Sequence, residues 1–481
     1  MIKNKNAEEE SNKPPPPDPS VFRGQSGTDC QCSSVVECGE NDRFLLLTAD
    51  GDGQVKLWNG ETKRNVWTVS DDDDDDDDDD ENTTKDPKRR VSSILAIEIV
   101  EDCKESDRYA FLTHERDGKV CLWVSSPEEK EDEEKEEDIF PPKRWRRKPT
   151  LKQVLETESE CHTFCPMSNV ITTVSPSLLL GNKSSEEGKK RGVVVARPAS
   201  ERGAVELVSV DLEGGRMTSK PILLKKREKV TTGGGREEGE EEEKEEEKEE
   251  EDNEKYGSVS ALKFLSKRTL MVGYESGHVT VVRTDEGDFP NNTQRCFKDM
   301  VTCIDSYVLR KNDEEDENIN RQDRMHVVAI GCADGSVTIY MGIELFTSVI
   351  ANFSLLSVSE GVYEEIFALK EDSAKGPYHS PDESTQGVAS LSFRADHKLL
   401  AVGYWDGKTR IFSHRKYWDT GTSHRIGPLL ACLKTEKLVR TDRLPGVASV
   451  QFRKKGGKEL LVCTRQDGCC RMWPIFPPSG G

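Results

Sequence analysis

The sequence lacks most of the features that mark an exported, membrane-spanning or catalytic protein. Its first residues, MIKNKNAEEESNK, contain no apolar segment of a secretory signal, and no stretch approaches the roughly 18 consecutive apolar residues of a membrane span. Only 8 His are present, and none lies in an HExxH motif. A nucleophile elbow and a phosphate-binding loop are also missing. We therefore predict a protein that is not an enzyme, with no catalytic residues and no cofactor.

Metal-binding patterns are also incomplete. The 14 Cys are mostly single residues within apolar segments, and without an export signal we expect reduced thiols that pack as small core residues. The DGDG stretch at 50–53 resembles part of a calcium loop, but it lacks flanking helices and a Glu at the twelfth position. Cys30 with Cys32, and CHTFC at 161–165, have no second pair at zinc spacing. No metal site is predicted.

The negative charge is concentrated in a few segments. The formal net charge is -22, and acidic runs at 71–81, 128–138 and 237–254 carry it. Outside these runs the chain has no basic stripe, so neither nucleic acid nor a membrane is expected as a partner. The basic segment KRWRRK at 143–148 is either a nuclear import signal or a solvated loop that balances the neighbouring acids. We expect the protein in the cytoplasm and the nucleus.

Seven copies of one short pattern organise the chain. Each copy has an apolar run, a polar corner that ends in Gly, and a second apolar run, most clearly in AVGYWDGKTRIF at 401–412. Asp-Gly between two apolar runs is a strong hairpin signal, because Gly reaches positive φ without steric cost. The predicted turn glycines are Gly53, Gly118, Gly203, Gly277, Gly335, Gly407 and Gly468.

Each copy extends into four predicted strands, a to d, with the corner between b and c. Short strands at regular spacing favour a closed all-β array over a sandwich of unrelated hairpins. The third copy is the weakest, with strand a placed at 161–164 and strand d at 221–224; the fifth has strand d at 344–350. The seventh lacks strand d, so we predict that SVFRGQ at 20–25 pairs beside 469–473 and removes two exposed edges.

The pattern resembles the WD repeat, in which strand b, an Asp-Gly corner and a strand c ending in Trp follow one another. Trp58, Trp123 and Trp473 keep the terminal Trp, whereas the Gly-His that usually opens a repeat is missing. The resemblance implies a seven-bladed WD-repeat-type β-propeller whose buried His–Asp hydrogen-bond network is incomplete.

This fold divides the chain into three parts. Residues 1–19 form a disordered Pro-rich segment, 20–476 the propeller with its closing strand at 20–25, and 477–481 a tail. Disordered charged insertions are expected at about 70–90, 125–149, 166–191, 225–255, 309–324 and 355–385.

A few stretches narrow the resemblance to one family. PPPPDPSVFRGQSG (14–27), GYESGHVTVV (273–282), and AVGYWDGKTRIFSHR (401–415) with PLLACLK (428–434) resemble the family of guanine nucleotide-binding protein subunit beta-like protein 1, which includes the fungal ASTRA-associated protein 1. The resemblance implies a non-enzymatic scaffold that works, as a monomer within a larger complex, with the Tel2–Tti1–Tti2 co-chaperone. That assembly matures phosphatidylinositol-3-kinase-related kinases. A G-protein γ subunit is not expected as a partner, because PPPPDP cannot form the N-terminal helix that coils with γ.

Two other function classes stay open. The binding alternative is a generic propeller adaptor, such as a ubiquitin-ligase substrate receptor or a ribosome-assembly factor. The enzyme alternative is a propeller hydrolase, which needs paired carboxylates or a triad facing the channel, and the sequence shows neither. Candidate partner contacts on the face of the b-to-c corners are Tyr274, Trp405 and Arg465. The acidic runs at 71–81 and 237–254 follow strand d and should leave on this face, either as solvated spacers or as a screen.

Overall fold

The structure is a computed structural model of the 481-residue chain. It describes residues 19–23, 29–38, 43–69, 92–101, 110–126, 150–156, 163, 165–172, 192–200, 203–211, 216–222, 256–284, 293–309, 325–343, 387–414, 426–433, 445–455 and 458–475. The acidic runs and most of the predicted insertions lie outside these residues. Among the described residues, no helix is long and apolar enough to cross a membrane.

The described strands form seven antiparallel sheets, which we number 1 to 7 along the chain. Sheet 1 contains β2 (Cys30–Cys38), β3 (Arg43–Asp50), β4 (Val55–Asn59) and β5 (Asn65–Val69), and sheet 2 contains β6 (Ile94–Glu101), β7 (Ala110–Glu115), β8 (Val120–Ser126) and β9 (Thr150–Glu156). Sheet 3 contains β10 (Ser168–Thr172), β11 (Gly192–Pro198), β12 (Val205–Asp211) and β13 (Arg216–Ile222), and sheet 4 contains β14 (Val259–Ser266), β15 (Thr269–Tyr274), β16 (His278–Arg283) and β17 (Gln294–Arg295). Sheet 5 contains β18 (Val301–Leu309), β19 (Met325–Cys332) and β20 (Val337–Ile343), and sheet 6 contains β21 (Val388–Phe393), β22 (Leu399–Tyr404), β23 (Thr409–His414) and β24 (Ile426–Leu433). Sheet 7 contains β25 (Val447–Lys455), β26 (Lys458–Arg465), β27 (Cys469–Pro474) and β1 (Ser20–Arg23).

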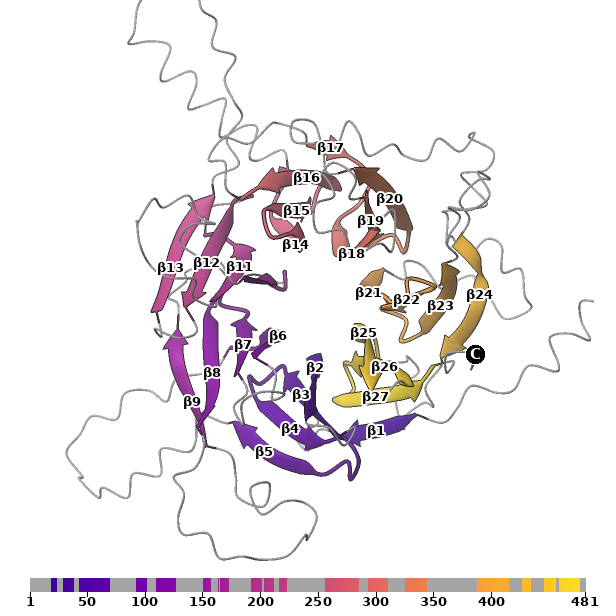
Figure 1. The fold of residues 1–481 in the computed structure, drawn as a ribbon. Coiled ribbons are helices and arrows are strands. Elements are labelled where there is room, and N and C mark those ends of the chain that lie inside the picture. Colours follow the sequence, from indigo (N-terminus) through magenta and orange to yellow (C-terminus); the bar gives the residue numbers. More distant parts are fainter. Residues whose placement is uncertain are drawn as a thin grey trace, which may run out of the picture.

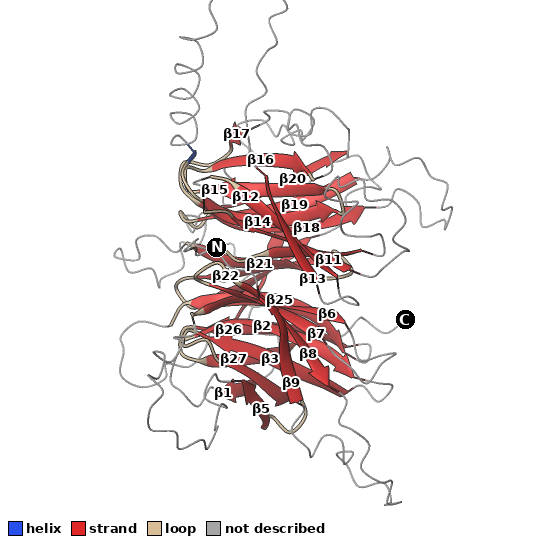
Figure 2. Ribbon diagram, turned by 90° about the vertical axis from the view of Figure 1, so that its left-hand side faces the viewer, coloured by secondary structure: helices blue, strands red, loops and turns tan. Residues whose placement is uncertain are grey.

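The sheets stand around a central axis like the blades of a propeller (Figure 1). Within sheets 1 to 6 the strands follow chain order from the innermost strand outward, so each sheet is a simple antiparallel meander. Seen edge-on, the ring is a thick disc (Figure 2). This arrangement places the first strand of every repeat beside the axis, and the residues on those strands face one shared space.

The corner between the second and third strand repeats nearly the same backbone in each sheet. All seven predicted turn glycines have positive φ, between 71° at Gly468 and 85° at Gly118 and Gly335. Outside sheet 3, the glycine N–H donates to the carbonyl three residues earlier; the Gly407 N–H bonds to the Tyr404 oxygen at 3.0 Å. A second bond ties the corner to the start of the innermost strand, as between the Trp405 N–H and the Gly387 oxygen at 2.9 Å. Corners and sheet-to-sheet connections therefore share one face of the ring, which we call the corner face.

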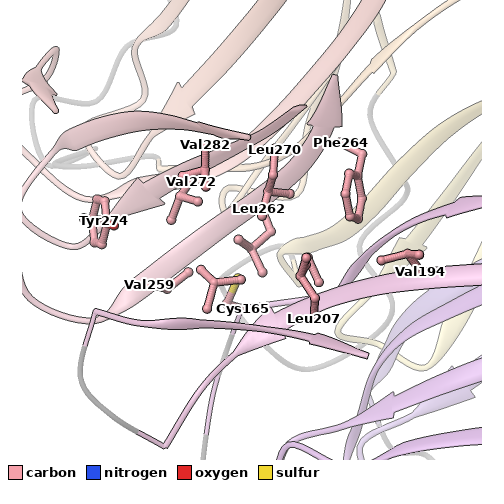
Figure 3. Packing of buried hydrophobic residues seen from close by; sticks show 12 residues of the cluster. Cys165, Val194, Leu207, Val259, Leu262, Phe264, Leu270, Val272, Tyr274 and Val282 are labelled. Carbon is pink, nitrogen blue, oxygen red and sulfur yellow. The ribbon is translucent and has the colours of Figure 1, made fainter. Parts of the chain in front are cut away.

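Apolar side chains fill every joint between neighbouring sheets. The seven buried hydrophobic clusters each join one pair of neighbours, including sheet 7 with sheet 1. Figure 3 shows the joint between sheets 3 and 4, where Val194 and Leu207 meet Leu262 and Leu270. Because both faces of each sheet are buried in this way, the second strand reads as a nearly continuous apolar run, as in LLAVGY of β22 and GVVVARP of β11.

The ring closes through the strand that the sequence places at 20–25. β1 pairs with β27 in antiparallel register, from Ser20 opposite Met472 to Arg23 opposite Cys469, and residues 24 and 25 lie outside the described set. Phe22 is buried and meets the Trp58 indole of sheet 1 edge-on, with ring centroids 6.0 Å apart. β1 thus completes sheet 7 and also packs against sheet 1.

Sheet 3 differs from its prediction. Its innermost strand is Ser168–Thr172 and not 161–164, so the start of the insertion predicted at 166–191 is a strand, and its outer strand is Arg216–Ile222 and not 221–224. The displacement arises because Ser168–Thr172 pairs along Gly192–Ala196, a match that the short polar sequence SNVIT does not reveal. The strand predicted at 344–350 lies outside the described residues.

Two of the retained tryptophans of the third strand each donate a hydrogen bond to a threonine of the second strand, which explains why these residues recur together. The Trp58 indole N–H donates to Thr48 Oγ1 at 2.8 Å, and that of Trp123 to Thr113 Oγ1 at 3.0 Å. Both bonds link the third strand to the second strand across the sheet. A buried Trp needs such an acceptor, and the Thr ten residues earlier supplies it.

Candidate functional site

The corner face carries side chains that differ from one sheet to the next. The exposed residues at the corner tips, one from each sheet whose corner is fully described, are Asp52, Arg116, Glu275, Asp334, Trp405 and Gln466. Three are acids, one is basic, and one is a large aromatic residue. The backbone of the corner is therefore a constant support, while its tips can recognise a partner.

Trp405 is the exposed large hydrophobic side chain among the described residues, with 42% of its surface accessible. Its ring lies against the backbone of Gly387, where a Cβ atom would collide with the indole. The side chain also borders the central cavity, together with Gln466 and Glu275. An aromatic ring that packs on the backbone with one face and is exposed to solvent on the other side is typical of a protein-binding contact.

The other two predicted contacts are buried. Tyr274 is 2% exposed and packs in the joint between sheets 3 and 4, where burial raises the pKa of its hydroxyl. Arg465 is 1% exposed, and its Nη2 donates to the Pro445 carbonyl oxygen at 2.6 Å. Burial, followed by repulsion from Arg471, lowers the pKa of Arg465. Of the three predicted residues, the structure therefore presents only the Trp405 side chain to a partner.

Acidic groups gather on the corner face beside the seam of the ring. Partial burial raises the pKa of Asp29, and the neighbouring carboxylates of Asp467 and Asp52 raise it further. Asp467 is also paired with Arg471 at 3.0 Å. Since the exposed corner tips add three acids and one base, the described corner face is better suited to a basic than to an acidic partner.

A cavity of about 1090 Å³ runs along the axis of the ring. The innermost strands of all seven sheets line it. Its size lies just above the roughly 300–1,000 Å³ of ordinary ligand sites, so it can accept a peptide side chain or a short segment of chain. Trp405 lies where this channel opens onto the corner face.

One layer of polar side chains surrounds the channel at mid-depth. In every sheet the side chain comes from an equivalent position of the innermost strand. In sheet 6, for example, this residue is Ser392, which pairs with Ala401 of β22. Ala401 lies two residues before Gly403, which pairs with the first residue of β23. The seven members are Ser34, Glu98, Ser168, Lys263, Asp305, Ser392 and Gln451, and all but the buried Ser34 line the cavity. We call this set the channel layer.

Several members of the channel layer join neighbouring sheets by hydrogen bonds. The backbone N–H of Phe264 donates to Ser168 Oγ at 3.0 Å, that of Phe452 to Ser392 Oγ at 3.0 Å, and that of Phe393 to Asp305 Oδ2 at 2.8 Å. In each case the acceptor lies one sheet before the donor. The layer therefore satisfies amide groups that the meander leaves free at the inner edge of the next sheet.

The charged members differ in how they are paired. Lys263 Nζ contacts Asp305 Oδ1 at 2.7 Å, and although burial acts to lower the pKa of Lys263, Asp305 outweighs it and the pKa is raised. Arg453, two residues after Gln451, donates from Nη2 to Gln451 Oε1 at 2.8 Å. Glu98 has neither a hydrogen bond nor an ion pair with any described residue. Burial raises the pKa of Glu98, while Arg453 and Lys263 act to lower it.

Sequence reasoning did not single out the channel layer. A signal was present, since Glu98, Lys263 and Asp305 each interrupt an apolar strand with a charge (ILAIEIV, VSALKFL and VTCIDSY). Their common register becomes visible only when the strand pairs are known. Cys30 and Cys32 are buried, and no group of three or more His, Cys, Asp or Glu in the described part of the chain is arranged to hold a metal ion.

Comparisons with known proteins agree with this architecture. Residues 376–413, which include β21 and β22, match the family WD domain, G-beta repeat. The fold is a WD-repeat β-propeller. No sequence match to a curated protein was found.

Solved structures resemble the propeller at low sequence identity. The crystal structure of Chaetomium thermophilum Raptor gives a TM-score of 0.52 at 11% identity over 98% of this chain, which spans 30% of the Raptor chain. The Cps50 (Swd1) β-propeller domain of Myceliophteria thermophila gives 0.51 at 11% identity, over 95% of this chain and 100% of that domain. U3-55K gives 0.52 at 11% identity, over 96% of this chain and 100% of its own. At such identities the likeness is one of fold, and propellers of this fold are typically scaffolds without catalytic activity.

Proposed function

We propose that this propeller is a non-enzymatic scaffold or adaptor that binds a protein partner on its corner face. The observation that carries the proposal is Trp405, an exposed aromatic ring fixed on Gly387 among tips of mixed charge. Trp is one of the residues in which binding energy most often concentrates. The described residues offer no competing catalytic arrangement.

The partner that the sequence favours is the Tel2–Tti1–Tti2 co-chaperone, with phosphatidylinositol-3-kinase-related kinases as clients. This finer proposal rests on the resemblance of residues 14–27, 273–282, 401–415 and 428–434 to the subunit beta-like protein 1 and ASTRA-associated protein 1 family. The stretch at 401–415 contains Trp405, so the residue that we propose as the main partner contact belongs to one of the segments that resemble this family. We further propose a cytoplasmic and nuclear location, a monomeric chain within a larger complex, and no γ subunit, nucleic acid or membrane as partner.

The test is recovery of partners by the tagged full-length protein, followed by mass spectrometry. Trp405→Ala is expected to reduce recovery of the specific partner at least roughly tenfold, since a central aromatic contact contributes about 2 kcal/mol or more. Arg116→Ala, at an exposed tip on the same face, is the matched control and should change recovery little. Depletion of the protein should lower the levels of the kinases. Recovery of a ubiquitin ligase or of ribosome-assembly proteins, with kinase levels unchanged, would replace the co-chaperone by the generic adaptor.

A further inference from the structure

The channel layer contains one carboxylate that lacks a partner. Lys263 and Asp305 neutralise each other, and the second oxygen of Asp305 accepts the Phe393 N–H. Ser168 and Ser392 accept amide bonds from the next sheet. Glu98 lines the same cavity without a hydrogen bond or an ion pair to any described residue. A half-buried carboxylate without donors is unusual, because partial loss of water is costly unless hydrogen bonds replace it.

The two cations beside the layer already have partners within the protein. The Lys263 ammonium is held by Asp305 at 2.7 Å, and Arg453 Nη2 donates to Gln451 Oε1 at 2.8 Å and to Ser34 Oγ at 3.5 Å. Arg453 Nε is free of hydrogen bonds, but the atom itself is buried and cannot meet a ligand. Among the described members of the layer, Glu98 is therefore the charged group without a hydrogen bond or an ion pair, and although Arg453 and Lys263 lie near it, its oxygens can still accept from a cationic donor.

The surroundings of the channel mouth point to the source of that cation. Asp52, Glu275 and Asp334 are exposed acids at the corner tips, and they favour the approach of a basic segment. Trp405 lies on the same face and borders the cavity. The face and the channel layer thus share a preference for positive charge.

The depth of the channel layer and the geometry of the Glu98 carboxylate favour a guanidinium over an ammonium group. The layer lies about 13 Å below the start of the innermost strands, since four residues separate Val301 from Asp305 and a strand rises about 3.3 Å per residue. A cation at Glu98 must therefore be carried into the channel by an extended segment or a loop. A guanidinium matches a carboxylate with two parallel N–H donors and is less strongly hydrated than an ammonium, so it enters such a site at lower cost.

We propose that the central channel binds an arginine side chain of a partner polypeptide, with the Glu98 carboxylate as its acceptor and Trp405 contacting the same segment at the mouth. The proposal deepens the protein-binding function proposed above and rests on it. It specifies that the partner segment is basic, and it does not identify the partner.

The experiment measures binding of a blocked heptapeptide of glycine and serine with one central arginine to the full-length protein by NMR. The matched probe carries citrulline, which has nearly the same shape and no charge. Wild-type protein should bind the arginine peptide at least about tenfold more tightly than the citrulline peptide, because a charge-assisted pair with a carboxylate is lost. Equal binding of the two peptides, or no arginine-specific binding up to roughly 10 mM, would overturn the proposal.

Two variants locate the site. Glu98→Gln should reduce the preference for arginine to less than about twofold, whereas Glu61→Gln, which removes an exposed acid in the turn between β4 and β5 that does not line the cavity, should leave it nearly intact. If Glu98→Gln kept the full preference, the channel assignment would be wrong. The wild-type comparison needs no variant, so it stands even if Glu98→Gln unfolds. Because the peptide test uses no cellular partner, its failure leaves the adaptor function to be judged by the partner-recovery experiment alone.

Discussion

The joints between neighbouring sheets and the channel layer are built from the same repeat, but the joints are apolar and the channel layer is polar. Every joint is filled by apolar side chains, which come from the second and third strands and also from the innermost strand, as Leu262 and Ile97 do. The channel layer uses one equivalent position of each innermost strand, and its members are serines, two acids, a lysine and a glutamine. A position covered by the next sheet must be apolar for the ring to form, whereas a position that faces the channel is free to acquire chemistry. Stability and recognition are thus separated by position along the innermost strand, where Leu262 packs in a joint and the next residue, Lys263, faces the channel.

The largest expected effect breaks the joint at the seam of the ring. Phe22→Ala removes a buried ring that contacts Trp58, and large-to-small changes of this kind cost about 3–5 kcal/mol. Deleting residues 1–26 should lower the melting temperature at least as much, because it also leaves β27 as an exposed edge. Deleting only residues 1–13 is the control and should change little. Equal melting of the two truncations would show that β1 contributes nothing to closure.

A pair of glycine substitutions tests how closely the corners pack. Gly203 and Gly277 have the same φ of 78°, so alanine at either site costs about 1–2 kcal/mol of backbone strain. A Cβ atom at Gly277 would also collide with the Phe297 oxygen, whereas at Gly203 the nearest atom is the Gly257 oxygen at 3.3 Å. We expect Gly277→Ala to destabilise by about 1–3 kcal/mol more than Gly203→Ala in chemical denaturation. Similar losses of unfolding free energy for the two variants would mean that the backbone at Phe297 shifts at little cost to make room for the added Cβ atom.

A comparison within the channel layer separates its structural from its recognition residues. Asp305→Ala leaves both the Phe393 amide and Lys263 without their acceptor, and should cost about 1–3 kcal/mol. Ser392→Ala removes an acceptor from the Phe452 amide alone and should cost about 1 kcal/mol. Glu98→Gln, at the equivalent position of sheet 2, should be nearly neutral. A large loss for Glu98→Gln would indicate that this residue also supports the fold.

Another modest predicted effect depends on pH and concerns His114, a polar residue in an otherwise apolar joint. His114 is buried between sheets 2 and 3, where its Nδ1 accepts the Met167 N–H at 3.1 Å. Burial, with added repulsion from Arg197, lowers the pKa of His114 to about 3. Between this value and the unfolded pKa of about 6.5, only the unfolded chain binds the proton, so stability falls as the pH falls.

Through His114, the unfolding free energy should fall by about 1.2 kcal/mol between pH 7 and pH 5.5. His114→Asn keeps a hydrogen-bond acceptor near the Nδ1 position and removes the titration. Its unfolding free energy, measured from pH 7 to pH 5, should therefore decline less steeply than that of the wild-type protein. Parallel pH profiles for the two proteins would contradict the assignment.

The fold was accessible from the sequence because its signals are local and repeated. The corner glycines and the apolar runs beside them predict the second and third strands, and β22 and β23 begin and end within about two residues of the limits of the pattern at 401–412. The unpaired edge of the seventh repeat predicts the closing strand. Sheet 3 was partly missed, since SNVIT is too short and polar to stand out from the insertion around it.

The candidate site was accessible only in part, for physical reasons. Trp405 could be predicted as an exposed contact because it sits at a corner tip. Tyr274 and Arg465 come from equivalent corners, but they occupy the first corner position, whose side chain turns into the protein, and the sequence does not distinguish the two directions. The channel layer brings together residues from Ser34 to Gln451, and no local pattern joins positions so far apart.

The pairing of Ser20 with Met472 has a consequence for how the chain is made. At a synthesis rate of roughly 5–20 residues per second, β1 leaves the ribosome about 20–90 s before β27 exists. Throughout that interval Phe22 has no sheet to enter, while the sheets from β2 onward can already form and stack. Closure is then a long-range event whose entropic cost is offset only once both strands are present. A nascent chain of this protein therefore carries an unfinished seam, which is the point where a chaperone, or a second unfinished chain, would meet it.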